Sequence, residues 1–206
     1  MTHKIHPTAI VEDDVEIGDG TAIWDNVHVR GPCKIGNSCI IGGKSYISYG
    51  VEIGDFVKIN SFVYIPTAVK LGNGVMISAG TIFTNDMTPR ATDPEITQLQ
   101  DSGPQETTLE TVVGDGVTIG AGSRIGGGIQ IGDFAMVGMG SVVTGDVREF
   151  HLVFGNPAKT KGAVCKCGEV VVRGRLEDHG TMNCASCGRD YAYDQGVVRQ
   201  LTEATP

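Results

Sequence analysis

Residues 35–65 read IGNSCIIGGKSYISYGVEIGDFVKINSFVYI, and isoleucine occupies every sixth position of this stretch. The same position is aliphatic from Ile5 to Ile77 and is taken by Phe83 at the next step. It is aliphatic again from Val113 to Val143. A strict period of six is neither a helical period nor a simple strand period, and it is typical of a parallel β-helix built from stacked coils. The sequence therefore predicts an all-β fold of this kind.

A single hexad, residues 15–20, shows how the repeat works. Val15 and Ile17 are two residues apart and point to one side of a short strand, while Glu16 points to the other. Gly18-Asp19-Gly20 then supplies residues that tolerate the backbone angles of a tight corner. Three such hexads close a triangular coil of eighteen residues. A second period of eighteen supports this, because Gly-Asp or Gly-Asn corners recur at Asp19, Asn37, Asp55 and Asn73, and again at Asp115 and Asp133.

The phase of the repeat locates an insertion. The hexad due at residue 89 appears instead at Val113, displaced by twenty-four residues, so about residues 85–109 are predicted to form a loop outside the coils. A long loop on a regular scaffold is usually functional. The predicted organisation is a β-helix domain over residues 1–160 and a small C-terminal module over residues 161–206.

The charge and the apolar pattern exclude several partners. A formal charge of −8 and a pI near 5.0 argue against nucleic acid or an anionic membrane as the main partner. No apolar run approaches the length of a membrane span, and residues 1–4 lead into the first hexad without a signal peptide. We therefore expect no membrane insertion and a cytoplasmic location, in which cysteines are thiols or metal ligands.

The six cysteines form two groups. Cys33 and Cys39 occupy inward positions of the coils and are interpreted as small apolar side chains. The other four follow the last hexad as two close pairs, which is the spacing of a zinc ribbon. Four thiolates make a closed tetrahedral site, so we expect a structural zinc rather than a catalytic one, with free thiols or a disulfide pair as the alternatives. The predicted ligands are Cys165, Cys167, Cys184 and Cys187.

The repeats resemble those of left-handed β-helix (hexapeptide-repeat) acyltransferases over about residues 5–160. This resemblance implies a left-handed coil. The segment 83–91, FTNDMTPRA, is similar to a loop of nucleotide-sugar 3-amino N-acetyltransferases that act on UDP-2-acetamido-3-amino-2,3-dideoxyglucuronate or dTDP-3-amino-3,6-dideoxyhexose. Residues 23–29 and 155–159 fit the same family. The chain departs from it at Thr88, where an aromatic residue is usual, and at residues 60–62, where two polar amides are usual.

The resemblance implies transfer of an acetyl group from acetyl-CoA to the amine of a UDP- or dTDP-linked 3-amino sugar. It places Asn85 where the amine meets the thioester, with Asp86 helping to hold the amine and Asn60 on the substrate side. The guanidinium of Arg90 suits a diphosphate or a sugar carboxylate. The structural alternatives are a loop cap for Asn85, a solvated turn carboxylate for Asp86 and a surface charge for Arg90.

The distribution of histidine bears on the chemistry. The chain has no histidine between Val29 and Phe150. A hydroxyl acceptor needs a base, whereas an amine with a free lone pair needs less help, so this absence favours N-acetylation. It also argues against a γ-type carbonic anhydrase, which needs three zinc-binding histidines in its middle coils. His28 is a possible base. It is expected to point outward in a column with Tyr46 and Tyr64, and a surface or trimer-contact ring is the alternative.

The last coils are the candidate cofactor site. Gly120 and Gly138 are expected to present bare backbone to an extended pantetheine arm. The resemblance implies that the arm contacts the next residue of each coil, Ala121 and Met139, and that Lys159 lies near the phosphates of coenzyme A. It also places the cleft between neighbouring subunits of a homotrimer. The alternatives are an O-acetyltransferase of a sugar or amino acid, and a non-catalytic β-helix scaffold with a zinc-binding docking module.

Overall fold

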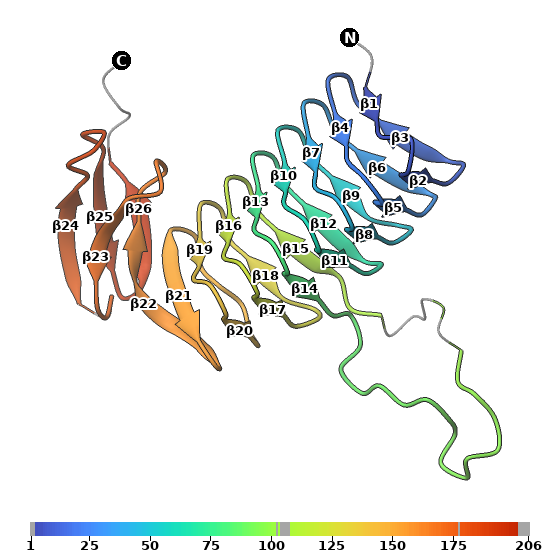
Figure 1. Cartoon of the computed structure of the whole chain (residues 1–206). Helices are drawn as coiled ribbons and strands as arrows, with labels where there is room; N and C mark the ends of the chain where they lie inside the picture. Colours follow the sequence, from blue (N-terminus) through green and yellow to red (C-terminus); the bar gives the residue numbers. More distant parts are fainter. Residues whose placement is uncertain (1–2, 102, 104–107, 177, 202–206) are drawn as a thin grey trace.

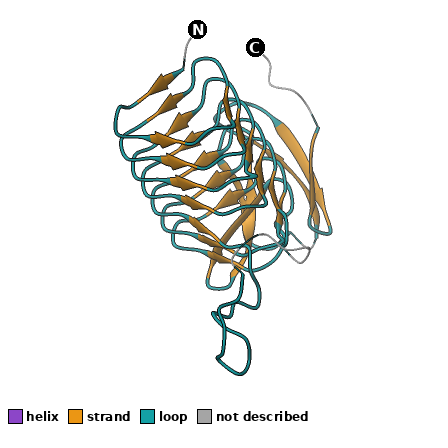
Figure 2. Cartoon of the chain, turned by 90° about the vertical axis from the view of Figure 1, so that its right-hand side faces the viewer, coloured by secondary structure: helices purple, strands orange, loops and turns teal. Residues whose placement is uncertain are grey.

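The computed structural model describes residues 3–101, 103, 108–176 and 178–201. All regular secondary structure in these residues is β, and three parallel sheets wrap around one elongated core (Figure 1). Viewed from the side, the coils lie one above another along the prism (Figure 2). The predicted all-β parallel β-helix is confirmed, while its left-handed sense stays an expectation from the resemblance. No helix among the described residues has the length and apolarity to cross a membrane.

Each sheet forms one face of the prism, and we call the three sheets faces A, B and C. Face A contains β1 (Lys4–Ile5), β4 (Ala22–Ile23), β7 (Ile40–Ile41), β10 (Lys58–Ile59), β13 (Met76–Ile77), β16 (Thr118–Ile119), β19 (Met136–Val137), β21 (His151–Gly155), β22 (Ala158–Val164) and β23 (Val170–Arg173). Face B contains β2 (Ile10–Val11), β5 (His28–Val29), β8 (Tyr46–Ile47), β11 (Tyr64–Ile65), β14 (Ile82–Phe83), β17 (Arg124–Ile125) and β20 (Val142–Val143). Face C contains β3 (Val15–Ile17), β6 (Cys33–Ile35), β9 (Glu52–Ile53), β12 (Val69–Leu71), β15 (Thr111–Val113) and β18 (Gln130–Ile131).

The strand register reproduces both sequence periods. Ile23 pairs with Ile41, and Ile41 pairs with Ile59, eighteen residues further each time. Phe83 pairs with Ile125, which is forty-two residues further, or eighteen plus the twenty-four predicted for the insertion. The inward side chains of all coils from Ile23 to Val153 join one continuous core. Cys33 and Cys39 lie in this core as predicted, and burial raises the pKa of Cys33 to about 12.

The corners between faces C and A explain the repeated Gly-Asp/Asn pair. The backbone N–H of Asp19 donates to the Oδ1 of Asn37 at 2.9 Å, and the N–H of Asn37 donates to the Oδ1 of Asp55 at 2.7 Å. The same bond continues coil by coil to Asp133. The preceding glycine permits this stacking, because a Cβ at Gly36 would lie 2.6 Å from the backbone of Gly54. The repeat residues therefore join each coil to the next.

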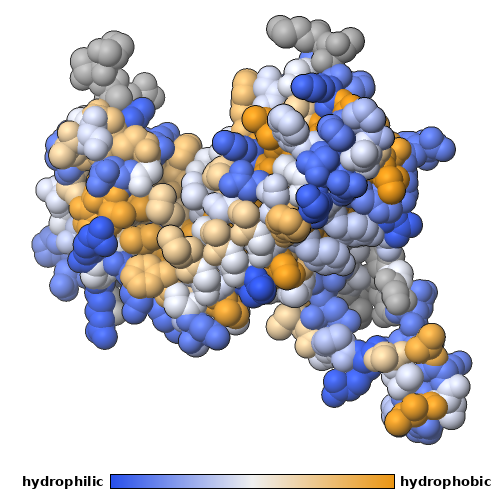
Figure 3. All heavy atoms as spheres, viewed as in Figure 1, coloured by the Kyte–Doolittle hydropathy of each residue, from blue (hydrophilic) through white to orange (hydrophobic). Residues whose placement is uncertain are grey.

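The insertion leaves the prism after β14 and returns at β15, and it projects away from the coils (Figure 1). The outer part of the insertion contains a turn at Asp93, whose Oδ1 accepts the N–H of Thr97 at 2.7 Å. Thr92 and Leu99 form an isolated antiparallel β-bridge. Residues 102 and 104–107 of the predicted loop lie outside the described residues. Apolar side chains are exposed on the projecting segment (Figure 3), with Ile96 79% and Leu99 81% exposed.

The C-terminal module continues face A rather than following a separate linker. The strand β22 pairs antiparallel with β21 and β23, so the predicted boundary at residue 160 falls inside a strand. A three-stranded antiparallel sheet follows, made of β24 (His179–Asn183), β25 (Asp190–Asp194) and β26 (Val197–Gln200). A second apolar cluster, including Phe150 and Tyr191, joins the module to the last coil of the β-helix.

Candidate active site and metal centre

Asn85 lies two residues beyond β14, at the corner between faces B and C where the insertion begins. Its side-chain Nδ2 donates to the carbonyl oxygen of Thr67 in the coil before, at 3.4 Å. On the other side, a Cβ at Gly127 would lie 3.0 Å from the Asn85 Cα, so a larger residue would require a small shift of this corner. The amide is half-buried, and no described residue donates to its Oδ1, which is therefore a candidate acceptor for a bound molecule.

Sequence reasoning missed the glycines that support both ends of the insertion. Gly127 contacts Asn85, and a Cβ at Gly128 would lie 2.9 Å from the Leu109 side chain on the returning segment of the loop. Three consecutive glycines, residues 126–128, fall in the coil directly after the insertion. This run breaks the repeat composition and is the signal by which the support could have been found.

Asp86 and Arg90 are exposed on the first part of the loop. The Oδ1 of Asp86 accepts the backbone N–H of Thr88 at 2.8 Å, which is an Asx turn. The guanidinium of Arg90 donates to the adjacent carbonyl oxygen of Pro89 at 3.1 Å. Asp86 thus makes a turn contact through one carboxylate oxygen, and its role in holding the amine stays a prediction. Arg90 presents a charge at the loop surface.

His28 stands in the predicted column on the outer side of face B. Its ring lies 5.5 Å from that of Tyr46, which stacks on Tyr64 at 5.3 Å. The Nε2 of His28 lies 2.9 Å from Glu12 Oε1, and because a carboxylate only accepts, Nε2 carries the proton. This hydrogen bond is the main reason that the pKa of Glu12 is lowered, and Arg30 also contacts Glu12 at 3.2 Å. Glu12 and Arg30 were not singled out from the sequence.

The structure does not bring His28 to Asn85. The strand pairing runs from His28 to Tyr46, then to Tyr64, then to Ile82, which precedes Asn85 in the same coil. Three coil steps of about 4.8 Å separate the two residues by about 14 Å along the prism. A base must lie within hydrogen-bond reach of the proton that it removes, directly or through one water. His28 is therefore too far from Asn85 to be that base within one chain.

The corner between faces A and B carries the predicted cofactor residues, but it differs from the expectation of bare glycine backbone. The N–H groups of Gly120 and Gly138 donate to the carbonyl oxygens of Val137 and Val153, both at 2.8 Å. Their carbonyl oxygens accept from the buried hydroxyls of Ser123 and Ser141. A Cβ at Gly120 would lie 2.4 Å from the backbone of the next coil. These glycines serve coil stacking, because the residue after each strand points along the prism.

The next residue of each coil is available to a ligand. Ala121 and Met139 are exposed, and no described residue accepts a hydrogen bond from the backbone N–H of either. They occupy equivalent positions in consecutive coils, so their N–H groups form a short row at the corner. Asn60 lies on the same edge in an earlier coil, where its backbone bonds to the neighbouring coils. Lys159 is exposed on β22, paired with Phe154 of β21, close to the coil that contains Gly138.

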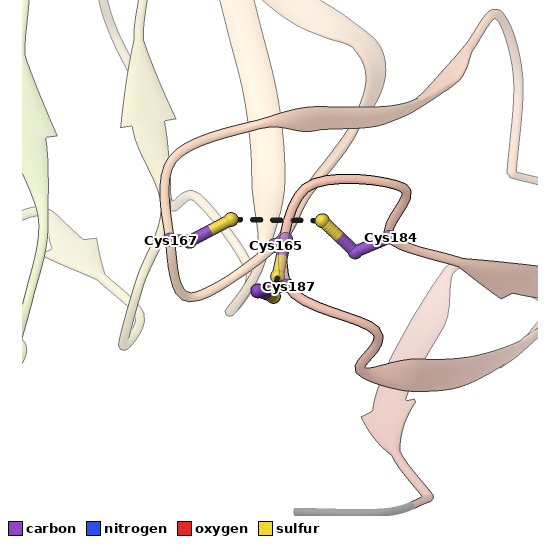
Figure 4. Close-up of side chains that lie close together, drawn as sticks. All are labelled: Cys165, Cys167, Cys184 and Cys187. Carbon is purple, nitrogen blue, oxygen red and sulfur yellow. Dashed lines mark hydrogen bonds between the residues drawn. The ribbon is translucent and has the colours of Figure 1, made fainter. Parts of the chain in front are cut away.

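The four C-terminal cysteines converge from two loops, one after β22 and one after β24 (Figure 4). Their Sγ atoms all lie within 4.8 Å of one another, with Cys165–Cys187 at 3.4 Å and Cys167–Cys184 at 3.6 Å. A tetrahedral zinc with Zn–S bonds of about 2.3 Å separates its sulfurs by about 3.8 Å, whereas a disulfide needs about 2.05 Å. The donor set and spacing therefore fit a tetrahedral thiolate site. The N–H and guanidinium of Arg189 contribute to lowering the pKa of Cys187 to about 6, which favours the thiolate.

Comparisons with known proteins agree with this architecture. Residues 14–48 and 110–145 match the family model of the bacterial transferase hexapeptide, and residues 32–66 match the hexapeptide repeat of succinyl-transferase. The dTDP-3-amino-3,6-dideoxy-alpha-D-galactopyranose 3-N-acetyltransferase of Aneurinibacillus thermoaerophilus is 40% identical over 91 residues. That match covers 44% of this chain and 45% of the relative. The chain thus carries the hexapeptide repeat of bacterial transferases and resembles a nucleotide-sugar 3-N-acetyltransferase, as its sequence predicted.

Solved structures show the same fold at lower identity. AntD, an N-acyltransferase from Bacillus cereus, was solved as a variant with dTDP-4-amino-4,6-dideoxyglucose and coenzyme A. It has a TM-score of 0.61 at 21% identity and covers 73% of this chain and 83% of its own. A second AntD structure, with dTDP and 3-hydroxybutyryl-CoA, has a TM-score of 0.53 at 19% identity and covers 81% and 84%. These likenesses establish the β-helix fold.

Proposed function

We propose that this chain is an acetyl-CoA-dependent N-acetyltransferase that acts on the amino group of a UDP- or dTDP-linked 3-amino sugar. The observation that carries the proposal is Asn85, which is held at the root of the insertion through its Nδ2 and receives no hydrogen bond at Oδ1 from a described residue. An amine N–H is such a donor. The similarity to a dTDP-3-amino-sugar 3-N-acetyltransferase over 91 residues supports the same acceptor class.

The order of coils suggests how two long substrates share the site. Ala121 lies one coil beyond Asn85, and Met139 lies one coil further. Their two N–H groups suit the amide carbonyls of a pantetheine arm, with Lys159 further along the prism for the phosphates. His28, Tyr46 and Tyr64 extend in the opposite direction from Asn85 and offer a surface to the nucleotide-linked sugar, with Asn60 and Arg90 as polar contacts. The acetyl donor and the acceptor would then meet at the coil of Asn85.

Acetyl transfer to an amine requires correct positioning of the amine more than it requires a base. The Oδ1 of Asn85 accepts one N–H of the sugar amine, which directs the nitrogen lone pair to the thioester carbonyl carbon. The C–N bond forms, the C–S bond breaks, and the nitrogen proton passes to the departing thiolate. A backbone N–H at the corner between faces A and B stabilises the carbonyl oxygen as its charge develops. The absence of histidine from residues 29–150 is consistent with an amine acceptor.

We also propose a homotrimer, because one chain places Asn85 and Ala121 at opposite corners of face B. A neighbouring copy in a cyclic arrangement would bring the corner of one chain to the loop root of the next. The outer side of face C alternates Glu16, Lys34, Glu52 and Lys70 along one column, which suits solvent. Face B carries the aromatic column instead, with Tyr64 44% exposed, so we place face B toward the interface in a cytoplasmic enzyme.

We propose that the cysteine cluster holds one structural zinc. Cys165, Cys167, Cys184 and Cys187 supply four thiolates and leave no open coordination position, so the metal would order the module without entering the reaction. Elemental analysis of protein purified under reducing conditions should find one zinc per chain. Protein that contains no zinc, or only traces of zinc that buffer exchange removes, would contradict this assignment.

The function is tested by an acetyl-transfer assay over a panel of UDP- and dTDP-linked amino sugars, with release of free thiol as the readout. Transfer to 3-amino sugars with no transfer to the matching 3-hydroxy sugars is the expected result. Transfer to the hydroxyl analogues would favour an O-acetyltransferase. Coenzyme A should also raise the melting temperature, because it binds the folded state alone, and the absence of any shift would favour a non-catalytic scaffold.

A further inference from the structure

Tyr191 lies between the cysteine cluster and the end of the β-helix. The side chain is 0% exposed, and its hydroxyl oxygen lies 3.1 Å from Cys165 Sγ and 3.0 Å from the backbone nitrogen of Lys166. Its ring lies 5.4 Å from that of Phe150, edge to face, and Phe150 stacks on Phe134 at 5.6 Å. The residue therefore touches a predicted metal ligand with its polar end and the last coils with its ring.

The chemistry of the partners fixes the direction of both hydrogen bonds. A backbone N–H only donates, so the Tyr191 oxygen accepts from Lys166. A sulfur bound to a metal has lost its proton and only accepts. The Tyr191 hydroxyl must then donate to Cys165 Sγ whenever the site is loaded, because burial leaves it no water partner. A hydrogen bond to a charged acceptor is about twice as strong as a neutral one.

We propose that Tyr191 is a positioning residue of the metal centre. Its hydroxyl donates a hydrogen bond to the Cys165 thiolate, and its ring packs on Phe150 and so connects that ligand to the last coils. This inference rests on the proposed metal site. It adds a residue outside the four ligands, and it gives the module a defined attachment to the acyl-CoA end of the β-helix.

The side-chain donors around the cluster are unevenly distributed, while the backbone N–H of Glu169 donates to Cys167. Arg189 donates to Cys187 at 3.1 Å, and Tyr191 serves Cys165, and these two sulfurs are neighbours at 3.4 Å. Among the described residues, no side chain outside the cluster donates to Cys167 or Cys184. Four thiolates around a divalent ion carry an excess of negative charge, so donors on one pair reduce the electron density of that pair. The two pairs of ligands therefore differ in their side-chain donors, which Tyr191 and Arg189 supply to one pair.

The substitution Tyr191→Phe isolates the hydroxyl, because it keeps the ring that packs on Phe150. Partners that support metal ligands typically contribute about 10- to 100-fold in metal affinity. We expect a loss in that range for zinc, measured by competition with a chromophoric chelator on the full-length protein. Tyr193→Phe is the matched control, since it makes the same change on the same strand, away from Cys165, and it should bind zinc like the wild type.

Cobalt substitution separates the hydrogen bond from a general loss of stability. Losing the acceptor for the Lys166 N–H would also weaken the fold, but it would not alter the electronic spectrum of the loaded site. Removing a donor from Cys165 makes its sulfur more electron-rich, so the thiolate-to-cobalt charge-transfer band should move to lower energy in Tyr191→Phe. Superimposable spectra and equal zinc affinities would overturn the role of Tyr191. A wild-type protein with no thiolate-to-cobalt band would instead overturn the metal site itself.

Discussion

The substitution Ala121→Pro tests the cofactor site through a single backbone group. Gly120, Ala121, Gly122 and Ser123 form a turn in which the N–H of Ser123 donates to the carbonyl oxygen of Gly120 at 3.3 Å. Gly122 has a φ of +70° and Ala121 has no positive φ, which together indicate a type II turn with Ala121 at its second position. Proline is favoured at that position, and the N–H that it removes has no acceptor among the described residues.

The expected effect follows from the lost hydrogen bond alone. A net contribution of about 0.5–1.5 kcal/mol for a hydrogen bond corresponds to about a 2- to 13-fold weaker affinity for coenzyme A. Folding should be unaffected or slightly favoured, by about 0.4–1 kcal/mol, because proline restricts the unfolded chain. If the same N–H also stabilises the developing oxyanion, turnover should fall by a further factor of about 100 to 1,000.

The assay is calorimetric titration of coenzyme A, followed by steady-state kinetics with acetyl-CoA. Ala79→Pro is the matched control, because Ala79 holds the same corner position one coil earlier, before Gly80 with a φ of +72°. It should retain wild-type affinity if the arm runs only along Ala121 and Met139. An Ala121→Pro protein that melts like the wild type and binds coenzyme A equally well would refute the placement of the arm.

Three further predictions concern polar side chains. Asn85→Ala should reduce turnover by about one to three orders of magnitude while leaving coenzyme A affinity nearly unchanged, since it removes the group that orients the amine; wild-type turnover would remove Asn85 from the mechanism. His28→Ala should raise KM for the nucleotide sugar and leave kcat within about twofold, as expected of a substrate-side residue outside reach of the reacting proton; a collapse of kcat would restore His28 as the base. Burial, with a smaller effect of Arg148, lowers the pKa of His151, so this group contributes stability above its ordinary pKa of about 6.5 that is lost as pH falls through the folded value. The melting temperature should therefore fall from about pH 7 to about pH 5 more in the wild type than in His151→Gln, and parallel profiles would contradict this.

The sequence was sufficient to predict the coils because burial in a β-helix follows a local period. The inward position, the eighteen-residue coil and the length of the insertion all depend on spacing, and the register of Phe83 with Ile125 confirms them. The direction of a corner side chain does not follow from that period. Gly120 was expected to open the backbone to a ligand, whereas the turn directs its Cβ position into the next coil. The exposed N–H without an acceptor among the described residues is one residue further on, at Ala121, where we propose that the cofactor binds.

The attachment of the C-terminal module depended on contacts that lie outside the hexad repeat. Cysteine spacing was enough to bring the four Sγ atoms together, because each pair lies within one short loop. The pairing of β22 with β21, and the packing of Phe150 on Tyr191, have no periodic signal in the sequence. Truncation after residue 161 would therefore interrupt β22 and expose Phe150, and the shortened protein should lose stability at the last coil.

The stacking of the coils sets the distances between residues along the prism, and these distances limit which residues can act on the same atom. Each coil adds about 4.8 Å, so residues three coils apart cannot share one reacting proton. Rotation about an axis parallel to the prism does not change a residue's height, so a cyclic trimer with such an axis leaves His28 as far from Asn85 in height as one chain does. The same symmetry does change which corners meet, and it can place Ala121 of one copy beside the loop root of another. In such a trimer, assembly would complete the proposed cofactor site but would not supply His28 as a base, which supports the proposed amine acceptor at the coil of Asn85.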